Sequence, residues 1–267
     1  MNRLQNKVAI VTGSTSGIGI GIARLYAAEG AQVIVCGRRA AKGQGVVDAI
    51  LAEGGKASFH TMDITDPASI EALVEDTVNT YGRIDILVNN AANVALKDGR
   101  VDELTIEMWD AIFQSDLRGT FYITKCVLPQ MRKDRRGGSI VNIGSMASCS
   151  GDLGSTAYAC AKAGVDMLTQ SVALQYGKDN VRCNCVRPGL IVTPDNEAKI
   201  PQALKDIFLS NIMVNRYGCP EDIGHACVYF GSDESAYVTG QIITVDGGMN
   251  SHAPTVAQFR AMGSRTW

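Results

Sequence analysis

The sequence predicts one doubly wound α/β domain, in which a parallel sheet of seven strands lies between layers of helices. Short runs rich in β-branched residues alternate with longer segments of helical period. The runs are apolar on both faces, as in residues 8–11 (VAIV), which is typical of parallel strands covered by helices on each side. The 267 residues are 46% hydrophobic, which suits one large core, and no repeat or linker divides the chain.

We expect each strand to be followed by a helix that crosses over to the next strand. Right-handed crossovers then produce a doubly wound sheet of the Rossmann type. The predicted strands are residues 8–11, 33–36, 57–60, 86–88, 140–143, 181–186 and 242–245. One stretch, residues 193–217, is expected to be irregular because Pro194 and Pro201 interrupt it. A long insertion of this kind is usually functional.

Charge and composition exclude several classes of protein. With 25 basic and 27 acidic residues, there is no basic surplus to neutralise a nucleic acid or an anionic membrane. The N-terminus lacks the apolar stretch of a signal peptide, and no run approaches the roughly 20 apolar residues of a membrane span. We therefore expect a cytoplasmic protein that acts on a small molecule. The eight cysteines include no CxxC pair and the three histidines share no ligand spacing, so we expect buried thiols and no metal site.

A glycine-rich turn directly follows the first strand and leads into a helical pattern. Its spacing is GxxxGxG, from Gly13 through Gly17 to Gly19. Glycines let the backbone approach a pyrophosphate, and the amides and dipole of a helix N-terminus stabilise its charge. The turn therefore predicts a dinucleotide site. The residues expected to line it are Gly13, Ser14, Thr15, Ser16, Gly17, Ile18 and Gly19.

This turn and several later motifs resemble those of the short-chain dehydrogenase/reductase family. Asn89-Asn90-Ala91, after the fourth strand, is similar to the family's NNAG motif, with Ala92 in place of the glycine. Pro188-Gly189 resembles the motif beside the nicotinamide, and residues 240–248 resemble the last strand with its VDGG end. The resemblance covers residues 7–249 and implies a bound nicotinamide dinucleotide. It adds to the expected cofactor contacts Asp63, which would touch the adenine ring, and Ile64, Asn90, Ala91, Ala92, Pro188, Gly189, Ile191 and Thr193.

The end of the second strand bears on which nicotinamide cofactor binds. Gly37 stands where an acidic residue would accept hydrogen bonds from the ribose 2′-hydroxyl of NAD. Arg38, Arg39 and Lys42 follow, and a guanidinium there would pair with the extra phosphate of NADP. We therefore predict NADP as the preferred cofactor, with NAD as the alternative. A solvated basic turn is the competing interpretation.

Tyr158 and Lys162 are four residues apart, so they share one face of a helix. Chance alone often produces a YxxxK pair, but Ser145 precedes this one at the end of the fifth strand, where the family has its catalytic serine. By resemblance, Tyr158 exchanges a proton with the substrate hydroxyl, which must lose its proton as hydride leaves the carbon. A neighbouring lysine charge favours the phenolate. Ser145 would donate a hydrogen bond to the substrate oxygen, and Tyr158 and Lys162 would also contact the cofactor, Lys162 at the nicotinamide ribose.

Asp116 departs from the family pattern, which has asparagine at this position. The resemblance implies that this fourth catalytic residue binds a water in the proton relay. An ionised aspartate accepts hydrogen bonds but donates none. It would also disfavour a nearby phenolate, which predicts a pH profile shifted toward alkaline values relative to Asp116→Asn.

The pocket predicted for the substrate is apolar. By resemblance, residues 193–217 form a lid, and the wall between Ser145 and Tyr158 contains no arginine or lysine. The residues expected to contact the substrate are Ser145, Met146, Leu153, Tyr158, Phe208 and Met213. A hydroxysteroid such as a bile acid is the leading prediction, although the same apolar pattern also suits a lid that only packs on the core.

Other functions stay open at this point. Among enzymes, the alternatives are a 3-oxoacyl thioester reductase and a sugar or polyol dehydrogenase. An alternative of another class is a dinucleotide-binding sensor without turnover. The intact set of Ser145, Tyr158 and Lys162 argues against a sensor.

Two further features bear on assembly. The helix expected over residues 157–176 is apolar on more than one face, which predicts packing against a second copy in a homotetramer or homodimer. After the VDGG end the chain continues as a tail, residues 250–267. Phe259, Met262 and Trp267 in this tail would cover a neighbouring subunit or its active site, and disorder is the competing interpretation.

Overall fold

Four buried apolar residues form the first strand, β1 (Val8–Val11), and the sheet extends from it on both sides. The computed structural model describes residues 2–92 and 98–263. The strands follow the order β3-β2-β1-β4-β5-β6-β7, and all neighbouring pairs are parallel. The strand order reverses between β1 and β4, and in sheets of this class ligands bind at the carboxyl ends of the strands near such a switch point. The predicted doubly wound sheet is therefore confirmed.

The other strands lie within two residues of their predicted bounds. They are β2 (Gln32–Gly37), β3 (Lys56–Thr61), β4 (Ile86–Asn89), β5 (Gly138–Ile143), β6 (Val181–Pro188) and β7 (Ile242–Val245). The strand β6 is longer than predicted because Arg187 and Pro188 still pair with Thr244 and Val245 of β7. This register brings the Pro188-Gly189 motif to the end of the strand.

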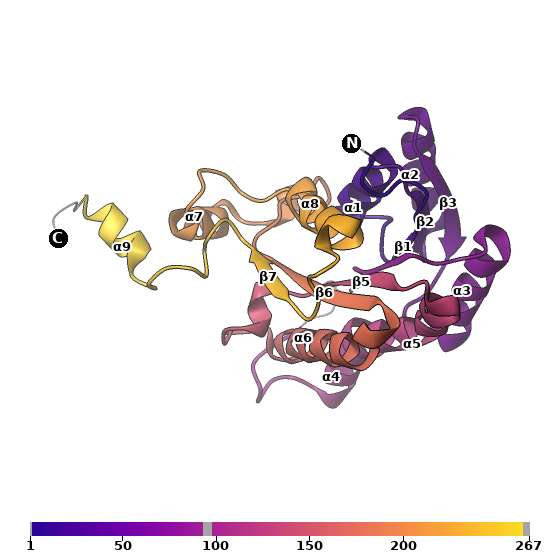
Figure 1. The fold of residues 1–267 in the computed structure, drawn as a ribbon. Helices are drawn as coiled ribbons and strands as arrows, with labels where there is room; N and C mark the ends of the chain where they lie inside the picture. The colour runs from indigo at the N-terminus through magenta and orange to yellow at the C-terminus, as the bar shows by residue number, and fades with distance from the viewer. Residues whose placement is uncertain (1, 93–97, 264–267) are drawn as a thin grey trace.

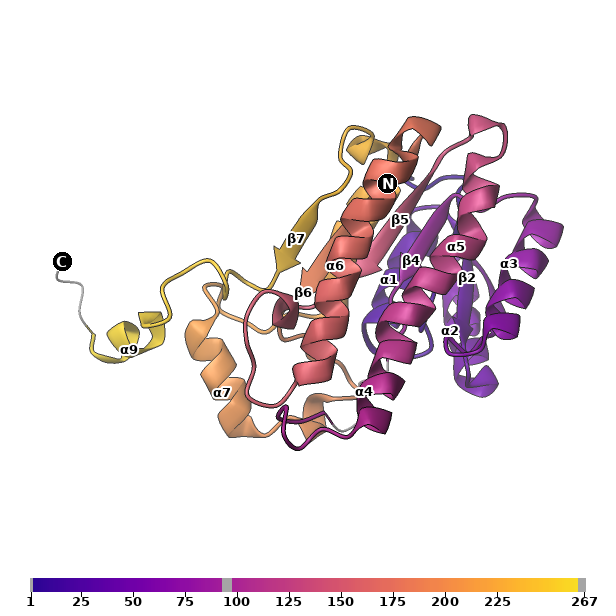
Figure 2. The ribbon, with the colours of Figure 1, turned by 90° about the horizontal axis from the view of Figure 1, so that it is seen from below.

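Helices cover both faces of the sheet, as Figures 1 and 2 show. One face is covered by α1 (Gly17–Ala28), α2 (Ala40–Ala52) and α8 (Pro220–Gly231). The other face is covered by α3 (Pro67–Tyr81), α4 (Ile106–Phe113), α5 (Gly119–Arg132) and α6 (Thr156–Tyr176). Short 3-10 helices span Lys133–Arg135, Met146–Ser148, Gly177–Asp179 and Asp233–Ser235. Within residues 2–92 and 98–263, no helix is both long and apolar enough to cross a membrane.

Two helices connect β4 and β5, where the sequence pattern predicted one helical segment. The helix α4 continues through a π-helical segment, Gln114–Arg118, into α5. A π-helical turn carries one more residue than an α-helical turn and is frequent at functional sites. Asp116 lies on this segment.

The stretch predicted to be irregular, residues 193–217, contains a helix, α7 (Gln202–Asn211), and a short 3-10 helix, Glu197–Lys199. Pro201 directly precedes α7, with φ −56°. A proline is tolerated at a helix start because the first amides have no partner within the helix. Pro201 is therefore the N-cap residue of a helix here, and the prediction that it interrupts regular structure was wrong.

The C-terminal segment ends in a short helix, α9 (Val256–Ala261), which lies beyond α7 and away from the sheet (Figures 1 and 2). The Nη1 atom of Arg260 donates to the carbonyl oxygens of Ser210 and Ile212, each at 3.0 Å. The tail is thus tied to the end of α7. Trp267, one of the three apolar tail residues singled out above, lies outside the described residues.

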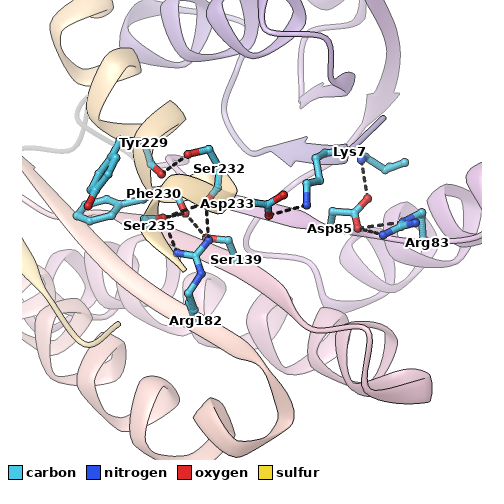
Figure 3. A network of polar contacts seen from close by, with 11 residues as sticks. Lys7, Arg83, Asp85, Ser139, Arg182, Tyr229, Phe230, Ser232, Asp233 and Ser235 are labelled. Carbon is cyan, nitrogen blue, oxygen red and sulfur yellow. Dashed lines mark hydrogen bonds and ion pairs between the residues drawn. The ribbon is translucent and has the colours of Figure 1, made fainter. Parts of the chain in front are cut away.

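Polar side chains connect neighbouring segments at the end of the sheet where the strands begin (Figure 3). Asp85 accepts the amide of Val8 at 2.8 Å and the Nε of Arg83 at 2.9 Å. The Nη1 of Arg182 donates to the hydroxyl of Ser235 at 2.8 Å. The opposite edge, where the strands end, carries the glycine turn and the other candidate site residues.

Candidate active site

The glycine turn between β1 and α1 is packed so closely that side chains are excluded at two positions. Gly13 has φ +65°, and a Cβ there would lie 2.8 Å from the Cα of Ala91. A Cβ on Gly19 would lie 2.5 Å from the carbonyl oxygen of Gly13. Only glycine fits such positions, so the motif that the sequence shows is the one that this turn requires.

Two polar side chains bind the turn to the end of β4. The hydroxyl oxygen of Thr12 accepts the amides of Asn90 and Ala91, both at 2.9 Å. The side-chain amide of Asn90 donates to the carbonyl oxygens of Thr12 (2.9 Å) and Gly13 (3.2 Å). Asn90 therefore shapes the candidate cofactor site by holding its turn. The sequence analysis missed Thr12, although it stands directly before the first glycine of the motif.

The N-terminus of α1 suits a pyrophosphate. Its N-cap residue, Ser16, is extended, and within the described chain its side chain makes no capping hydrogen bond and the first turn carries no acidic residue. The amides at this end of the helix are therefore available to an anion. Ser14 has a different part, since its buried hydroxyl donates to the carbonyl of Val11 (2.6 Å) and accepts the amide of Cys36 (3.0 Å). Ser14 thus joins the turn to β2.

The end of β2 presents cations beside this turn. Thr15 packs against Gly37, where a Cβ would lie 2.9 Å from the Thr15 Cγ2. Arg38 and Arg39 follow and are exposed, and Arg39 is the N-cap residue of α2. Across residues 2–92 and 98–263, none of the ion pairs involves either arginine, so both guanidinium groups are available to a ligand anion.

The residues after β3 lie at the same edge of the sheet. The Oδ1 of Asp63 accepts the amide (2.9 Å) and the hydroxyl (2.8 Å) of Thr65. Ile64 packs against the start of α5, where a Cβ on Gly119 would lie 2.5 Å from its Cγ1. Both residues therefore lie at the end of the sheet at which the turn after β1 is found.

Ser145 is the second residue after the carboxyl end of β5, and Tyr158 and Lys162 lie in the first two turns of α6. The buried Nζ of Lys162 donates to the carbonyl oxygen of Ile143 at 3.0 Å and lies 5.7 Å from the centroid of the Tyr158 ring. The Oγ of Ser145 accepts the amide of Ala147 at 3.1 Å. A hydroxyl that accepts in this way still has its own proton to donate.

The ring of Tyr158 is held by a small apolar cluster between α4 and α6. Its buried members are Ile112, Ala157 and Ala161, and its partly buried members are Leu104, Met108, Trp109, Phe113, Leu117 and Tyr158 itself. The ring of Tyr158 packs against this cluster through its carbon atoms. The hydroxyl group is therefore not needed to keep the ring in place.

Asp116 is buried on the π-helical segment that packs against α6. The packing is close, because a Cβ on Gly164 of α6 would lie 2.7 Å from the Leu117 Cδ2. The hydroxyl of Ser115 donates to the Oδ1 of Asp116 at 2.6 Å. The structure thus places this carboxyl group beside the helix that carries Tyr158 and Lys162.

The residues predicted beside the nicotinamide lie where β6 ends. Gly189 donates its amide to the carbonyl of Val245 at 3.0 Å. Ile191 is buried and forms a bridge with Gly218. The buried Thr193 donates its amide to the side-chain oxygen of Asn196 at 2.8 Å.

Some of the residues predicted to contact the substrate pack against the protein, whereas Leu153 does not. Met213 donates its amide to the carbonyl of Gly247 at 2.8 Å, and a Cβ on Gly248 would lie 2.2 Å from its Cε. The segment after α7 therefore rests on the end of β7. Phe208 on α7 and Met146 on its 3-10 helix are partly buried. Leu153, by contrast, is 94% exposed.

An ion pair between the buried Asp166 and the partly buried Arg187 lies one helical turn beyond Lys162 along α6. The Oδ2 of Asp166 accepts the Nε (3.1 Å) and the Nη2 (2.7 Å) of Arg187, and the two side chains are 8% and 19% exposed. Cys185 donates its thiol to the Oδ1 of Asp166 at 3.4 Å. Burial raises the pKa of this thiol to about 12, so it stays protonated at neutral pH.

This ion pair joins α6 to β6 directly behind the candidate catalytic residues. A Cβ on Gly144, the neighbour of Ser145, would lie 3.2 Å from both the Oδ1 of Asp166 and the Cγ of Arg187. Arg187 also directly precedes Pro188. The sequence analysis missed the pair, although a spacing of four residues places Asp166 on the helix face that carries Tyr158 and Lys162.

Comparisons with known proteins agree with this geometry. The family model described as enoyl-(acyl carrier protein) reductase matches residues 13–250. The 3-oxoacyl-[acyl-carrier-protein] reductase FabG of Thermotoga maritima is 40% identical over 247 residues, which are 92% of this chain and 99% of that relative. The 7alpha-hydroxysteroid dehydrogenase of Clostridium sardiniense is 39% identical over 261 residues, 97% of this chain and 99% of that relative.

A solved structure is also similar over most of its length. It is a 7alpha-hydroxysteroid dehydrogenase complexed with NADH and 7-oxo glycochenodeoxycholic acid, with a TM-score of 0.88 and 33% sequence identity over 92% of this chain and 95% of that one. The chain belongs to the short-chain dehydrogenase/reductase family. It is an oxidoreductase that acts on alcohol or ketone groups and uses a nicotinamide dinucleotide.

Proposed function

We propose that this enzyme is an NADP(H)-dependent oxidoreductase of a bulky, apolar secondary alcohol or ketone, with a hydroxysteroid such as a bile acid as the leading substrate class. The observation that carries the reaction is the buried Lys162 ammonium beside the Tyr158 ring, close to Ser145. The substrate class is supported by the apolar side chains of α7 and by two similar proteins that are named 7alpha-hydroxysteroid dehydrogenases.

Each candidate catalytic residue has a part that follows from its position. A bound nicotinamide supplies the acceptor or donor of the hydride. Tyr158 takes the proton from the substrate hydroxyl in one direction and returns it in the other. Lys162, fixed by the carbonyl of Ile143, favours the phenolate by its positive charge. Ser145, whose proton is free to donate, stabilises the charge that develops on the substrate oxygen.

The cofactor preference is expected to depend on Arg38 and Arg39. Because a charged hydrogen bond contributes about 1.5–3 kcal/mol, we expect kcat/KM to be about 10- to 100-fold higher with NADP than with NAD. The double variant Arg38→Gln/Arg39→Gln should lose this preference mainly through a higher KM for NADP. Arg135→Gln, an exposed arginine at the other edge of the sheet, is the matched control. An equal kcat/KM of the wild-type enzyme with both cofactors would contradict the proposed preference for NADP.

Asp116 is expected to shift the pH dependence of turnover. A negative charge beside α6 disfavours a phenolate nearby, so Asp116→Asn should move the rising limb of the kcat profile to lower pH. The measurement is kcat for alcohol oxidation across the pH range for both enzymes at saturating cofactor. Superimposable profiles would mean that the charge at position 116 does not act on Tyr158.

We further propose that a second copy of the chain covers the outer face of α5 and α6. An open groove of about 280 Å³ between these helices is lined by apolar side chains, among them Phe121, Leu168 and Tyr176, and by polar ones, among them Lys125 and Gln175. Met167 and Leu174 on α6 are 61% and 86% exposed. We expect a mass in solution of two or four times 28.4 kDa, measured by light scattering, and a smaller mass for Phe121→Glu. A monomeric wild-type protein would contradict this proposal.

A second candidate function is the reduction of a 3-oxoacyl thioester. The similarity to the 3-oxoacyl-[acyl-carrier-protein] reductase of Thermotoga maritima favours it. The Lys162, Tyr158 and Ser145 arrangement serves either substrate, so only turnover distinguishes them.

A spectrophotometric panel tests the proposed function. In the oxidation assay, the purified enzyme is mixed with NADP or NAD and with hydroxysteroids, sugars, polyols or simple secondary alcohols, and the absorbance of the reduced nicotinamide is followed. In the reduction assay, the enzyme is mixed with NADPH and a 3-oxoacyl thioester, and the loss of the same absorbance is followed. Steroid-dependent reduction of NADP would support the proposal. Turnover of the thioester or a polyol alone would move the assignment to that substrate, and cofactor binding without any turnover would favour the sensor.

A further inference from the structure

The first turn of α6 takes its cap from a distant part of the chain. In the described part of the chain, the N-cap residue Ser155 makes no capping hydrogen bond with its side chain. The carboxylate of Asp98 supplies it instead. Its Oδ1 accepts the amide of Ala157 at 3.2 Å, and its Oδ2 accepts the amide of Tyr158 at 2.8 Å.

The segment that supplies this cap is held to the helix by more than one contact. The Oδ1 of Asp98 also accepts the amide of Gly99 at 2.8 Å. The hydroxyl of Thr156 donates to the carbonyl oxygen of Gly99 at 2.7 Å. Residues 98 and 99 therefore bind both the backbone and a side chain of the first turn of α6.

The position of Tyr158 in this turn makes the cap important. The first amides of a helix have no partner within the helix, and an end without a cap frays. Tyr158 is the third residue of α6, so its own amide is one of those that need an external acceptor. A carboxylate is a strong acceptor there because it also interacts favourably with the positive end of the helix dipole.

We infer that Asp98 is a positioning residue for the proton transfer by Tyr158. It holds the backbone from which the phenol projects, while Lys162 lies one turn further along, where the helix makes its own hydrogen bonds. The inference rests on the proposed function, because that function assigns the proton transfer to Tyr158.

The experiment compares two aspartates that cap helices. Asp66 accepts the amide of Ala68 at the start of α3 at 3.0 Å, and α5 lies between α3 and α6 (Figure 2). Asp98→Ala, Asp98→Asn and Asp66→Ala are measured for kcat, for nucleotide affinity and for amide hydrogen exchange. The exchange measurement needs no substrate, and the Asn variant covers the case in which Asp98→Ala does not fold.

For Asp98→Ala we expect faster exchange confined to the first turns of α6 and a kcat lower by about 10- to 100-fold, as for a small misplacement of a catalytic group. Nucleotide affinity should stay near that of the wild type. Asp98→Asn keeps one acceptor oxygen, so its kcat and its exchange rate in α6 should lie between those of the wild type and of Asp98→Ala. Asp66→Ala should loosen α3 only and keep its kcat.

Three results would overturn the inference. The first is a wild-type kcat in both Asp98 variants, the second is unchanged exchange in α6, and the third is an equal loss of kcat in Asp66→Ala. A wild-type enzyme without turnover on any alcohol or ketone would defeat the proposed function, and this inference with it, even if the exchange result were as expected.

Discussion

Replacing Tyr158 with phenylalanine is expected to lower kcat by about 10²- to 10⁴-fold, the usual contribution of a general acid–base group. The fold should be kept because the ring, and not the hydroxyl, packs among Ile112, Ala157 and Ala161. Nucleotide binding should stay near that of the wild type, because the glycine turn and Lys162 are unchanged. The measurements are kcat with the preferred substrate and nucleotide affinity by fluorescence titration.

Tyr176→Phe is the matched control for this experiment. Tyr176 lies at the other end of the same helix, with the guanidinium of Arg132 5.4 Å from its ring centroid. This variant also loses one phenolic hydroxyl, but away from the candidate site, so its kcat should not change. Substantial activity in Tyr158→Phe would refute the proposed role of Tyr158.

Of all the substitutions proposed here, Arg187→Met is expected to lower the free energy of unfolding the most. It leaves the Asp166 carboxylate buried without its cation, and breaking a buried pair in this way typically costs about 3–5 kcal/mol. The free energy of unfolding by urea is the measurement. Because Gly144 packs against both side chains, we also expect the Ser145 segment to loosen and kcat to fall.

The double variant Asp166→Asn/Arg187→Met separates the lost charge balance from lost packing. It removes both charges, so most of the stability should return, within about 1–2 kcal/mol of the wild type. Arg83→Met is a useful comparison, since it breaks the pair with Asp85 at the opposite edge of the sheet and should lower stability without lowering the kcat of the folded enzyme. No recovery in the double variant would mean that shape, and not charge, decides the effect of Arg187.

The strands were predictable because each one is a local pattern. Residues 8–11 and 242–245 have the bounds that their apolar runs predict. The run at residues 8–11 is buried throughout, as is typical of a parallel strand that is covered by helices on both faces. Helix α7 was missed because proline was interpreted as a break. In the structure Pro201 directly precedes the first turn of α7, where the backbone amide that proline lacks would have no partner within the helix.

The sequence by itself determined the sheet, the glycine turn and the Tyr158–Lys162 spacing, because each depends on residues that are close together in the chain. Only the tertiary structure decided that Asp98 caps α6 and that Arg187 neutralises Asp166. These partners are 60 and 21 residues apart, and a carboxylate alone in a sequence does not reveal which amide or cation it meets. The packing of β5, β6 and α6 brings these groups together, because a buried charge or an open helix end is stable only with a partner.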